Sequence, residues 1–113
     1  MTEAIAPTFR VSNATESADW YKRLGFEVVG EHRFAPNLPL FLFLKRGDID
    51  LYLSEHKGDA PKRSLAYLWV DEVDLVAAEF GAEIHEEPWG AEITLVDPDG
   101  NRVRVATPID PTV

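Results

Sequence analysis

The two halves of the chain repeat one pattern at a fixed offset of 59 residues. Val11 and Val70 each end a short apolar segment, and each is followed by a polar helix start and an apolar stripe. The stripe residues match in pairs at this offset: Ala14, Ser17, Ala18 and Tyr21 in the first half, and Val73, Val76, Ala77 and Phe80 in the second. Gly25 and Gly81 follow the two stripes. Such a repeat predicts two similar modules whose sheets face one another across a cleft.

The composition predicts a single domain. With 113 residues and a 45% apolar content, the chain is long and apolar enough to form a core. No apolar run approaches the roughly 20 residues of a membrane span, and the N-terminus has no secretion signal. The absence of cysteine excludes disulfides and thiolate chemistry. We therefore expect a cytoplasmic protein.

The net charge of −9, from 20 acidic and 11 basic residues, bears on the partners. An acidic surface repels phosphate backbones, so we expect no nucleic-acid partner, and it attracts cationic ligands. The alternative interpretation is that the charge serves solubility alone.

In the first half, Asn13 is the predicted helix N-cap, with Glu16 as its capping-box partner. The helix is expected to bury Tyr21 fully and Trp20 at its margin. Gly25 fits the left-handed position after the helix. Short apolar and alternating runs predict four strands at residues 8–11, 26–29, 40–44 and 49–53.

In the second half, Asp71 is the predicted N-cap of a helix over 72–80. Strands are predicted at residues 65–70, 83–85, 93–96 and 102–106. The last two form a hairpin across Asp97-Pro98-Asp99-Gly100-Asn101, a segment typical of a turn, in which Gly100 supplies a positive φ. Module one spans about residues 1–58 and module two about 62–108, and each has the order β-α-β-β-β.

Alternation along the strands sorts side chains onto two faces. Leu51 and Leu53 should lie under the helix, and Asp50 and Tyr52 on the open face. The same pattern places Tyr67 and Trp69 together, opposite Ala66, Leu68 and Val70. It also places Val103 and Val105 under the second helix, opposite Arg102 and Arg104.

With these elements, the chain resembles the vicinal oxygen chelate superfamily. The matching segments are Val11 through Tyr21, Leu24-Gly25-Phe26 and Asp97-Pro98-Asp99-Gly100-Asn101. This superfamily includes glyoxalase I, extradiol dioxygenases, fosfomycin-resistance enzymes and bleomycin-resistance proteins. The resemblance implies an α+β fold with two tandem βαβββ modules. In the enzymes it also implies a divalent metal held by His, Gln or Glu ligands, two from each half.

The residues at the implied ligand positions depart from that pattern. They are Ala6, Leu65, Arg104 and, depending on register, Tyr52 or Asp50. One carboxylate cannot hold a metal that needs at least about three protein ligands, and an arginine repels a cation. The three histidines, His32, His56 and His85, lie outside the matched positions. We therefore expect no metal and no catalysis.

The sequence is most similar to the bleomycin-resistance branch. This similarity rests on residues 65–70, on Glu87-Pro88-Trp89-Gly90 and on Ile93-Thr94-Leu95. It implies a homodimer that sequesters a cationic glycopeptide antibiotic of the bleomycin type in grooves at the dimer interface. Pro7 stands where this branch has a proline in the strand that is exchanged between subunits. No cofactor is expected, because the ligand carries its own chelated metal, such as copper.

Aromatic residues outside the helix stripe suit such a ligand. A planar bithiazole stacks on indole and phenyl faces, and a cationic tail interacts with rings and carboxylates. The expected ligand-binding residues are Phe34, Tyr52, Ser54, Tyr67, Trp69, Pro88, Trp89 and Gly90. Tyr52 and Ser54 take this role only through alignment with the family. The alternative for Trp69 is plain core, and for Phe34 it is packing against a partner subunit.

Two other functions stay open. The first is a metal-dependent lyase or dioxygenase of the same superfamily, acting through an unorthodox metal site. The second is a binding module for another planar or cationic small molecule, because a fold alone does not give a function.

Overall fold

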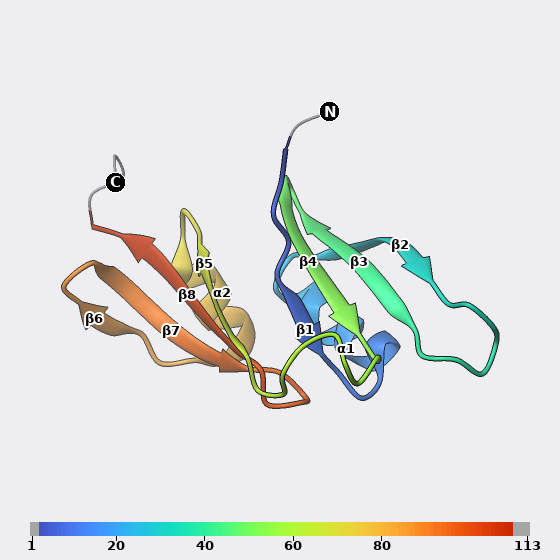
Figure 1. Ribbon diagram of the computed structural model, residues 1–113. Helices are drawn as coiled ribbons and strands as arrows, with labels where there is room; N and C mark the ends of the chain where they lie inside the picture. Colours follow the sequence, from blue (N-terminus) through green and yellow to red (C-terminus); the bar gives the residue numbers. More distant parts are fainter. Residues whose placement is uncertain (1–2, 110–113) are drawn as a thin grey trace. The chain divides into compact units, whose positions relative to one another are not determined.

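A computed structural model describes residues 3–109 and divides into two compact units (Figure 1). The first unit comprises the chain up to Ser64 together with Asp97–Asn101. The second comprises Leu65–Val96 and the chain from Arg102 onward. Each unit contains one four-stranded sheet and one helix, so the α+β fold with two tandem modules is confirmed. Below, the two units are called the first and second module.

The first module consists of one helix on one face of a mixed sheet. Its elements are β1 (Thr8–Arg10), α1 (Ala14–Arg23), β2 (Glu27–His32), β3 (Phe41–Arg46) and β4 (Ile49–Ser54). The strand order is β1-β4-β3-β2, with β1 parallel to β4 and the other pairs antiparallel. The helix α1 packs on β2, β3 and β4.

The second module repeats this arrangement. Its elements are β5 (Leu65–Trp69), α2 (Val73–Phe80), β6 (His85–Glu87), β7 (Gly90–Val96) and β8 (Arg102–Pro108). The strand order β5-β8-β7-β6, again with a parallel first pair, matches that of the first module. The helix α2 packs on β7 and β8.

Apolar side chains between helix and sheet form the core of each module. Tyr21, Leu44 and Leu53 are fully buried in the first, and Ile93 and Val105 in the second. The predicted alternation is confirmed: Leu51 is buried beside Leu53, and Val103 beside Val105. The opposite face of each sheet carries the partly exposed side chains of the same strands.

Several strand boundaries differ from the predictions, and two of the strands concerned are β2 and β6. The strand β2 continues to His32, past the expected end at Val29, because a register shift after Val28 lets Gly30 pair with Phe43. At Gly30, a Cβ would lie 3.2 Å from the Phe43 ring, so the glycine gives this ring its space. The strand β6 begins at His85, where the predicted strand ended. Its pairing is fixed by the tight turn that joins it to β7, which the strand alternation does not reveal.

The N-terminus of α1 is capped as predicted, and that of α2 is not. Asn13 caps α1 as expected, because its side chain accepts a hydrogen bond from the Glu16 amide at 3.0 Å. Asp71 does not cap α2: the N-cap is Glu72, which makes no side-chain capping bond. Instead the Thr107 hydroxyl, on β8, accepts the hydrogen bond from the Val73 amide at 2.8 Å.

The turn between β7 and β8 is part of the first module. Its Asp97 carboxylate accepts a hydrogen bond from the buried Tyr21 hydroxyl at 2.8 Å. Burial, and then the nearby Asp97 charge, raise the pKa of the Tyr21 phenol. Asp99 accepts hydrogen bonds from the Ser12 amide at 2.9 Å and the Ser12 hydroxyl at 2.6 Å. Gly100 has φ +86°, which confirms its predicted role in the turn. Neither helix of residues 3–109 is long and apolar enough to cross a membrane.

Candidate functional site

The strand registers define the open face of each sheet as two rows of residues. In the first module, one row consists of Thr8, Tyr52, Phe43 and Gly30, and the other consists of Arg10, Ser54, Phe41 and His32. In the second module, one row consists of Tyr67, Arg104 and Thr94, and the other consists of Trp69, Ala106, Glu92 and His85. The 59-residue offset relates Thr8 to Tyr67, so Tyr52 and Arg104 occupy equivalent positions. The two modules thus share a scaffold and carry different side chains on its open face.

Two stacked aromatic rings dominate the open face of the second module. The Tyr67 and Trp69 rings lie 6.0 Å apart, centroid to centroid, with an interplanar angle of 19°. They are 41% and 48% exposed, which is unusual for such large rings. Arg104 lies 5.8 Å from the Tyr67 ring centroid and donates a hydrogen bond to the Tyr67 hydroxyl at 3.4 Å, which raises the pKa of the guanidinium. The alternative of Trp69 as a plain core residue does not fit this exposure.

A third exposed ring belongs to the hairpin turn between β6 and β7. Pro88 and Trp89 form its two-residue loop, and Trp89 is 47% exposed. The indole Nε1 donates a hydrogen bond to a Glu92 carboxylate oxygen at 3.0 Å, and Glu92 is only 8% exposed. Gly90 has φ +156°, and a Cβ there would lie 2.1 Å from the Thr107 carbonyl oxygen, so only glycine fits. Sequence reasoning missed Glu92, although its separation of three residues from Trp89 was visible.

The open face of the first module holds three packed aromatic rings. Phe41, Phe43 and Tyr52 lie 5.0 to 5.6 Å from one another, centroid to centroid. Sequence reasoning predicted Tyr52 here and missed Phe41 and Phe43. The alternation that placed Tyr52 on this face would have placed both on it, because they pair with Ser54 and Tyr52 across the β3–β4 ladder.

Beside these rings lies a hollow of about 420 Å³. Phe34, on the loop between β2 and β3, lines this hollow and is 75% exposed. Its ring makes an edge-on contact with His32 at 4.4 Å. Ser54 is fully buried, and its hydroxyl donates a hydrogen bond to Asp59 at 2.5 Å. Asp59 lines the hollow and Ser54 does not, so the contribution of Ser54 is to hold the Asp59 carboxylate.

The positions that hold a metal in the superfamily's enzymes do not suit one here. The register places Tyr52, and not Asp50, at the position equivalent to Arg104. Asp50 forms an ion pair with Lys45 at 2.7 Å. Ala6 and Leu65 offer no donor atom. Within residues 3–109, no three His, Cys, Asp or Glu side chains gather in a way that could bind an ion. The side chains present therefore do not fit the divalent metal.

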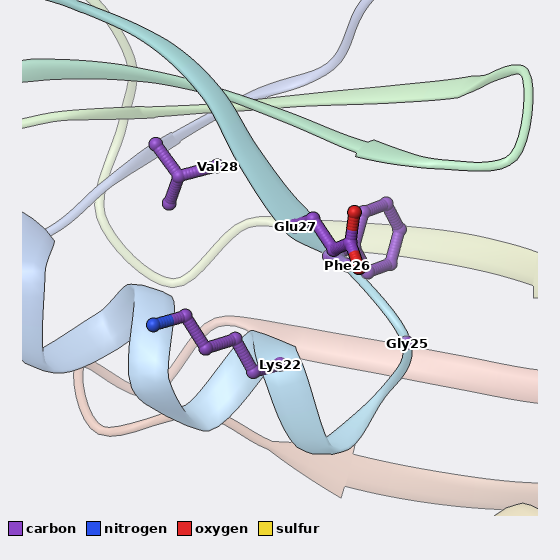
Figure 2. Close-up of a pocket in the computed structure, with 5 residues that line it drawn as sticks. All are labelled: Lys22, Gly25, Phe26, Glu27 and Val28. Atoms are coloured by element: carbon purple, nitrogen blue, oxygen red, sulfur yellow. The ribbon is translucent and has the colours of Figure 1, made fainter.

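Another hollow, of about 530 Å³, lies where α1 leads into β2 (Figure 2). Lys22, Gly25, Phe26, Glu27 and Val28 line it. The Lys22 side chain runs along the helix, and Phe26 is buried in the core. None of the predicted site residues lies in this hollow, and its single lysine is paired with Asp19 at 3.4 Å.

Comparison with protein families gives one match that decides the ancestry. A family model described as glyoxalase superfamily protein matches residues 1–111. The chain belongs to this superfamily. The predicted resemblance is therefore confirmed at the level of the superfamily. Comparison with curated proteins gives no match.

Solved structures with the same fold include a bleomycin-binding protein and two antibiotic resistance proteins. A bleomycin-binding protein complexed with bleomycin is 26% identical, with a TM-score of 0.70, over 94% of this chain and 98% of the other. A bleomycin resistance determinant encoded on the transposon Tn5 is 25% identical, with a TM-score of 0.71, over 96% of this chain and 100% of the other. The fosfomycin resistance protein FosX from Listeria monocytogenes is 14% identical, with a TM-score of 0.72, over 96% and 94% of the two chains. This last likeness concerns the fold alone.

Proposed function

We propose that this protein is a cytoplasmic binding protein that sequesters a cationic antibiotic of the bleomycin type without altering it. The observation that carries the proposal is the exposed aromatic surface of the second module, formed by Tyr67, Trp69 and Trp89. The likeness to a bleomycin-binding protein and to a bleomycin resistance determinant supports it.

The geometry of this surface suits a flat heteroaromatic group. Tyr67 and Trp69 already stack on each other at 19°, so a planar ligand can lie on rings that are held in place. The hydrogen bond from Trp89 to Glu92 restricts the third ring, which lowers the entropic cost of binding. The buried Glu92 carboxylate and the net charge of −9 favour a ligand that carries positive charge.

The first module has an aromatic surface of its own that also suits a cationic ligand. Phe34, Phe41 and Phe43 line its hollow, and Tyr52 packs against the last two. Asp59, in the same hollow, places a carboxylate beside these rings, a combination that attracts cationic groups. We propose that this surface also binds cationic groups, independently of the surface of the second module.

Calorimetric titration with bleomycin, with and without copper, tests the ligand. Trp89→Ala should weaken binding by about 2 kcal/mol or more, as truncation of a central aromatic anchor often does. Trp69→Ala should have a similar effect. Leu75→Ala is the control, because Leu75 is also a large exposed apolar side chain but lies on α2. Absence of binding heat at micromolar protein would refute this ligand, and an unchanged affinity of the Trp89 variant would remove that residue from the site.

The non-catalytic part of the proposal rests on the unsuitable metal positions. Ala6, Leu65 and Arg104 supply neither a donor set nor a charge that would hold a divalent ion. Because FosX shares the fold, metal analysis of the purified protein is the deciding measurement. A stoichiometric divalent ion, retained through dialysis, would favour a metal-dependent enzyme instead.

We also propose a homodimer in which the strand β1 is exchanged between subunits. In the chain described here, β1 pairs with its own β4, and the Tyr52 amide donates a hydrogen bond to the Pro7 carbonyl at 2.9 Å. A partner's β1 would form the same bonds, and Pro7 would stiffen the segment that leads to it. Light scattering should give twice the chain mass, and a monomer at working concentration would refute the exchange.

A further inference from the structure

A third hollow, of about 490 Å³, collects basic side chains on this acidic protein. Arg10, Lys62 and Arg63 line it, together with Asp99 and Gly100 of the turn between β7 and β8. All of these residues belong to the first module. We propose that this hollow is a binding site for a phosphate group, formed by residues other than those of the aromatic surfaces that we assign to the drug.

The charge balance of the hollow is opposite to that of the protein. The chain as a whole carries −9, whereas three cations and one carboxylate give this hollow a net charge of +2. In the described part of the chain, none of the three cations forms an ion pair with a carboxylate. Like charges that converge on one concave surface repel each other, and a bound anion removes that repulsion.

The single carboxylate of the hollow is already engaged by neutral donors. Asp99 accepts hydrogen bonds from the Ser12 amide and hydroxyl through one oxygen, and from the Ser17 hydroxyl at 3.3 Å through the other. Asp99 therefore anchors the turn on the start of α1. Arg10 donates one hydrogen bond to the Val11 carbonyl oxygen at 2.5 Å. The other donors of its guanidinium, together with Lys62 and Arg63, can bind an anion.

One buried side chain fixes two of the cation-bearing segments to each other. Asn101 is fully buried, and its amide nitrogen donates a hydrogen bond to the Arg10 carbonyl at 3.0 Å. Its amide oxygen accepts a hydrogen bond from the Ser64 amide, next to Arg63, also at 3.0 Å. The distance between the backbones of Arg10 and Arg63 is thus set by a rigid element, which lowers the cost of organising a site.

The backbone of Arg63 supports the same conclusion. Its φ is +59°, and it is the only residue other than glycine with a positive φ within residues 3–109. This conformation costs about 1–2 kcal/mol in an L-residue, and such conformations gather at ligand sites. The Arg63 Cγ lies 3.3 Å from the place where a Cβ would be at Gly100, so the arginine stem rests on the turn.

The charge of the cluster favours a phosphate over a carboxylate ligand, because a phosphate ester carries up to two negative charges and a carboxylate carries one. Two guanidinium groups present forked donors that match oxyanions, and Lys62 adds a point charge. A cationic drug is repelled by the same groups. The hollow is also large enough for a small phosphate ester, since small-molecule sites span about 300–1,000 Å³.

Amide NMR titration of the full chain with sodium phosphate, at constant ionic strength, tests this site. We expect saturable shifts at residues 10–12, 62–64 and 98–101. The double variant Lys62→Gln/Arg63→Gln should weaken phosphate binding at least about tenfold, which corresponds to the loss of one charge-assisted contact. The control Lys22→Gln/Lys45→Gln removes the same charge elsewhere and should retain the wild-type affinity.

A parallel titration with glycerol phosphate distinguishes the source of the phosphate group. Tighter binding than inorganic phosphate identifies a phosphorylated small molecule as the ligand, and equal binding identifies the free anion. Shifts that do not saturate, or an equal loss of affinity in both double variants, would overturn the proposal. Bleomycin affinity should be the same in the wild type and in Lys62→Gln/Arg63→Gln, so this test is independent of the proposed drug binding.

Discussion

Asp97 shows how much one side chain contributes to this fold. Its carboxylate accepts four hydrogen bonds, from the Tyr21 hydroxyl, the Asp99 amide, and the amide and side chain of Asn101. The sequence predicts the turn, because Asp, Pro, Gly and Asn are typical turn residues. It does not predict the bond to Tyr21, because 76 positions separate the two residues. The turn residues and the helix stripe that contains Tyr21 are local patterns, and neither indicates that the two segments meet.

Replacing Tyr21 with phenylalanine tests the value of this buried bond. The variant keeps the ring packing and removes the donor, which leaves one carboxylate oxygen with fewer partners. Because hydrogen bonds to charged groups contribute about 1.5–3 kcal/mol, the free energy of unfolding at pH 7 should fall by that amount. Urea denaturation measures it, and a change below about 0.5 kcal/mol would mean that the bond adds little to stability.

The same tyrosine makes stability depend on alkaline pH. Burial and the Asp97 charge raise its pKa above the ordinary value of about 10. Above pH 10, the unfolded chain loses the phenol proton while the folded chain keeps it, so the free energy of unfolding decreases as pH rises. Denaturation between pH 9 and 11 should show a steeper decrease for the wild type than for Tyr21→Phe. Parallel curves would contradict this assignment.

Glu92 is predicted to position Trp89. Glu92→Ala removes the acceptor of the indole hydrogen bond, so Trp89 should become more mobile, whereas Glu92→Gln keeps an acceptor at the same place. Fluorescence anisotropy of a variant in which Trp89 is the only tryptophan reports this mobility. Bleomycin affinity should fall more in Glu92→Ala than in Glu92→Gln. An equal loss in both variants would mean that the carboxylate charge, and not the positioning, matters.

At the scale of elements, the first amide of each helix donates a hydrogen bond to a side chain at the end of a strand that is distant in the sequence. The Ala14 amide donates a hydrogen bond to Glu55 at 2.8 Å, and the Val73 amide to Thr107 at the same distance. Glu55 and Thr107 each follow directly after the equivalent residues Ser54 and Ala106. The duplication therefore conserved the position of this cap between the modules and changed its chemistry.

Sequence patterns predicted the elements well where the chain itself contains the signal. The helix stripes, the Asn13 cap and the alternation in β4, β5 and β8 depend on neighbouring residues. The start of α2 was wrong by one residue because its cap comes from Thr107, 34 positions away from Val73. The candidate site was predicted only in part. Tyr67 and Trp69 were predicted because they share one strand. Phe41 and Phe43 were not, because they join the aromatic surface through the packing of β3 beside Tyr52.

Thr107→Val tests the cap of α2. Valine keeps the shape and removes both the acceptor for the Val73 amide and the donor to the Val70 carbonyl. We expect a loss of about 1–2 kcal/mol, as for other N-caps, and faster hydrogen exchange at the first turn of α2. Thr94→Val, on an exposed position of β7, is the control and should change neither quantity.

At the scale of the whole molecule, the chain is a duplication whose two sheets diverged in chemistry. The two sheets have the same strand order, but equivalent positions hold different side chains. Thr8 corresponds to Tyr67, and Tyr52 corresponds to Arg104. The helix side of each sheet remained apolar, because any change there would cost core packing. The open side was free to change, and it now holds the aromatic surfaces of the proposed function.

The duplication also predicts how the molecule unfolds. The segment Asp97–Asn101 connects two strands of the second module but belongs to the compact unit of the first. Neither module can lose its structure without disturbing this segment, so the chain should unfold in one cooperative transition. Trp20 lies on α1 and Trp69 on β5, so each reports on one module.

Two single-tryptophan variants, one retaining Trp20 and one retaining Trp69, make this prediction measurable. Their urea transitions should coincide once each is corrected for the stability of its own variant. Adding Tyr21→Phe, a change confined to the first module, should lower the midpoint reported by Trp69 as much as the one reported by Trp20. Because that substitution touches only the bond to Asp97, a shift in Trp20 alone would show that the modules unfold independently. Equal shifts would identify the shared turn as the segment that couples them.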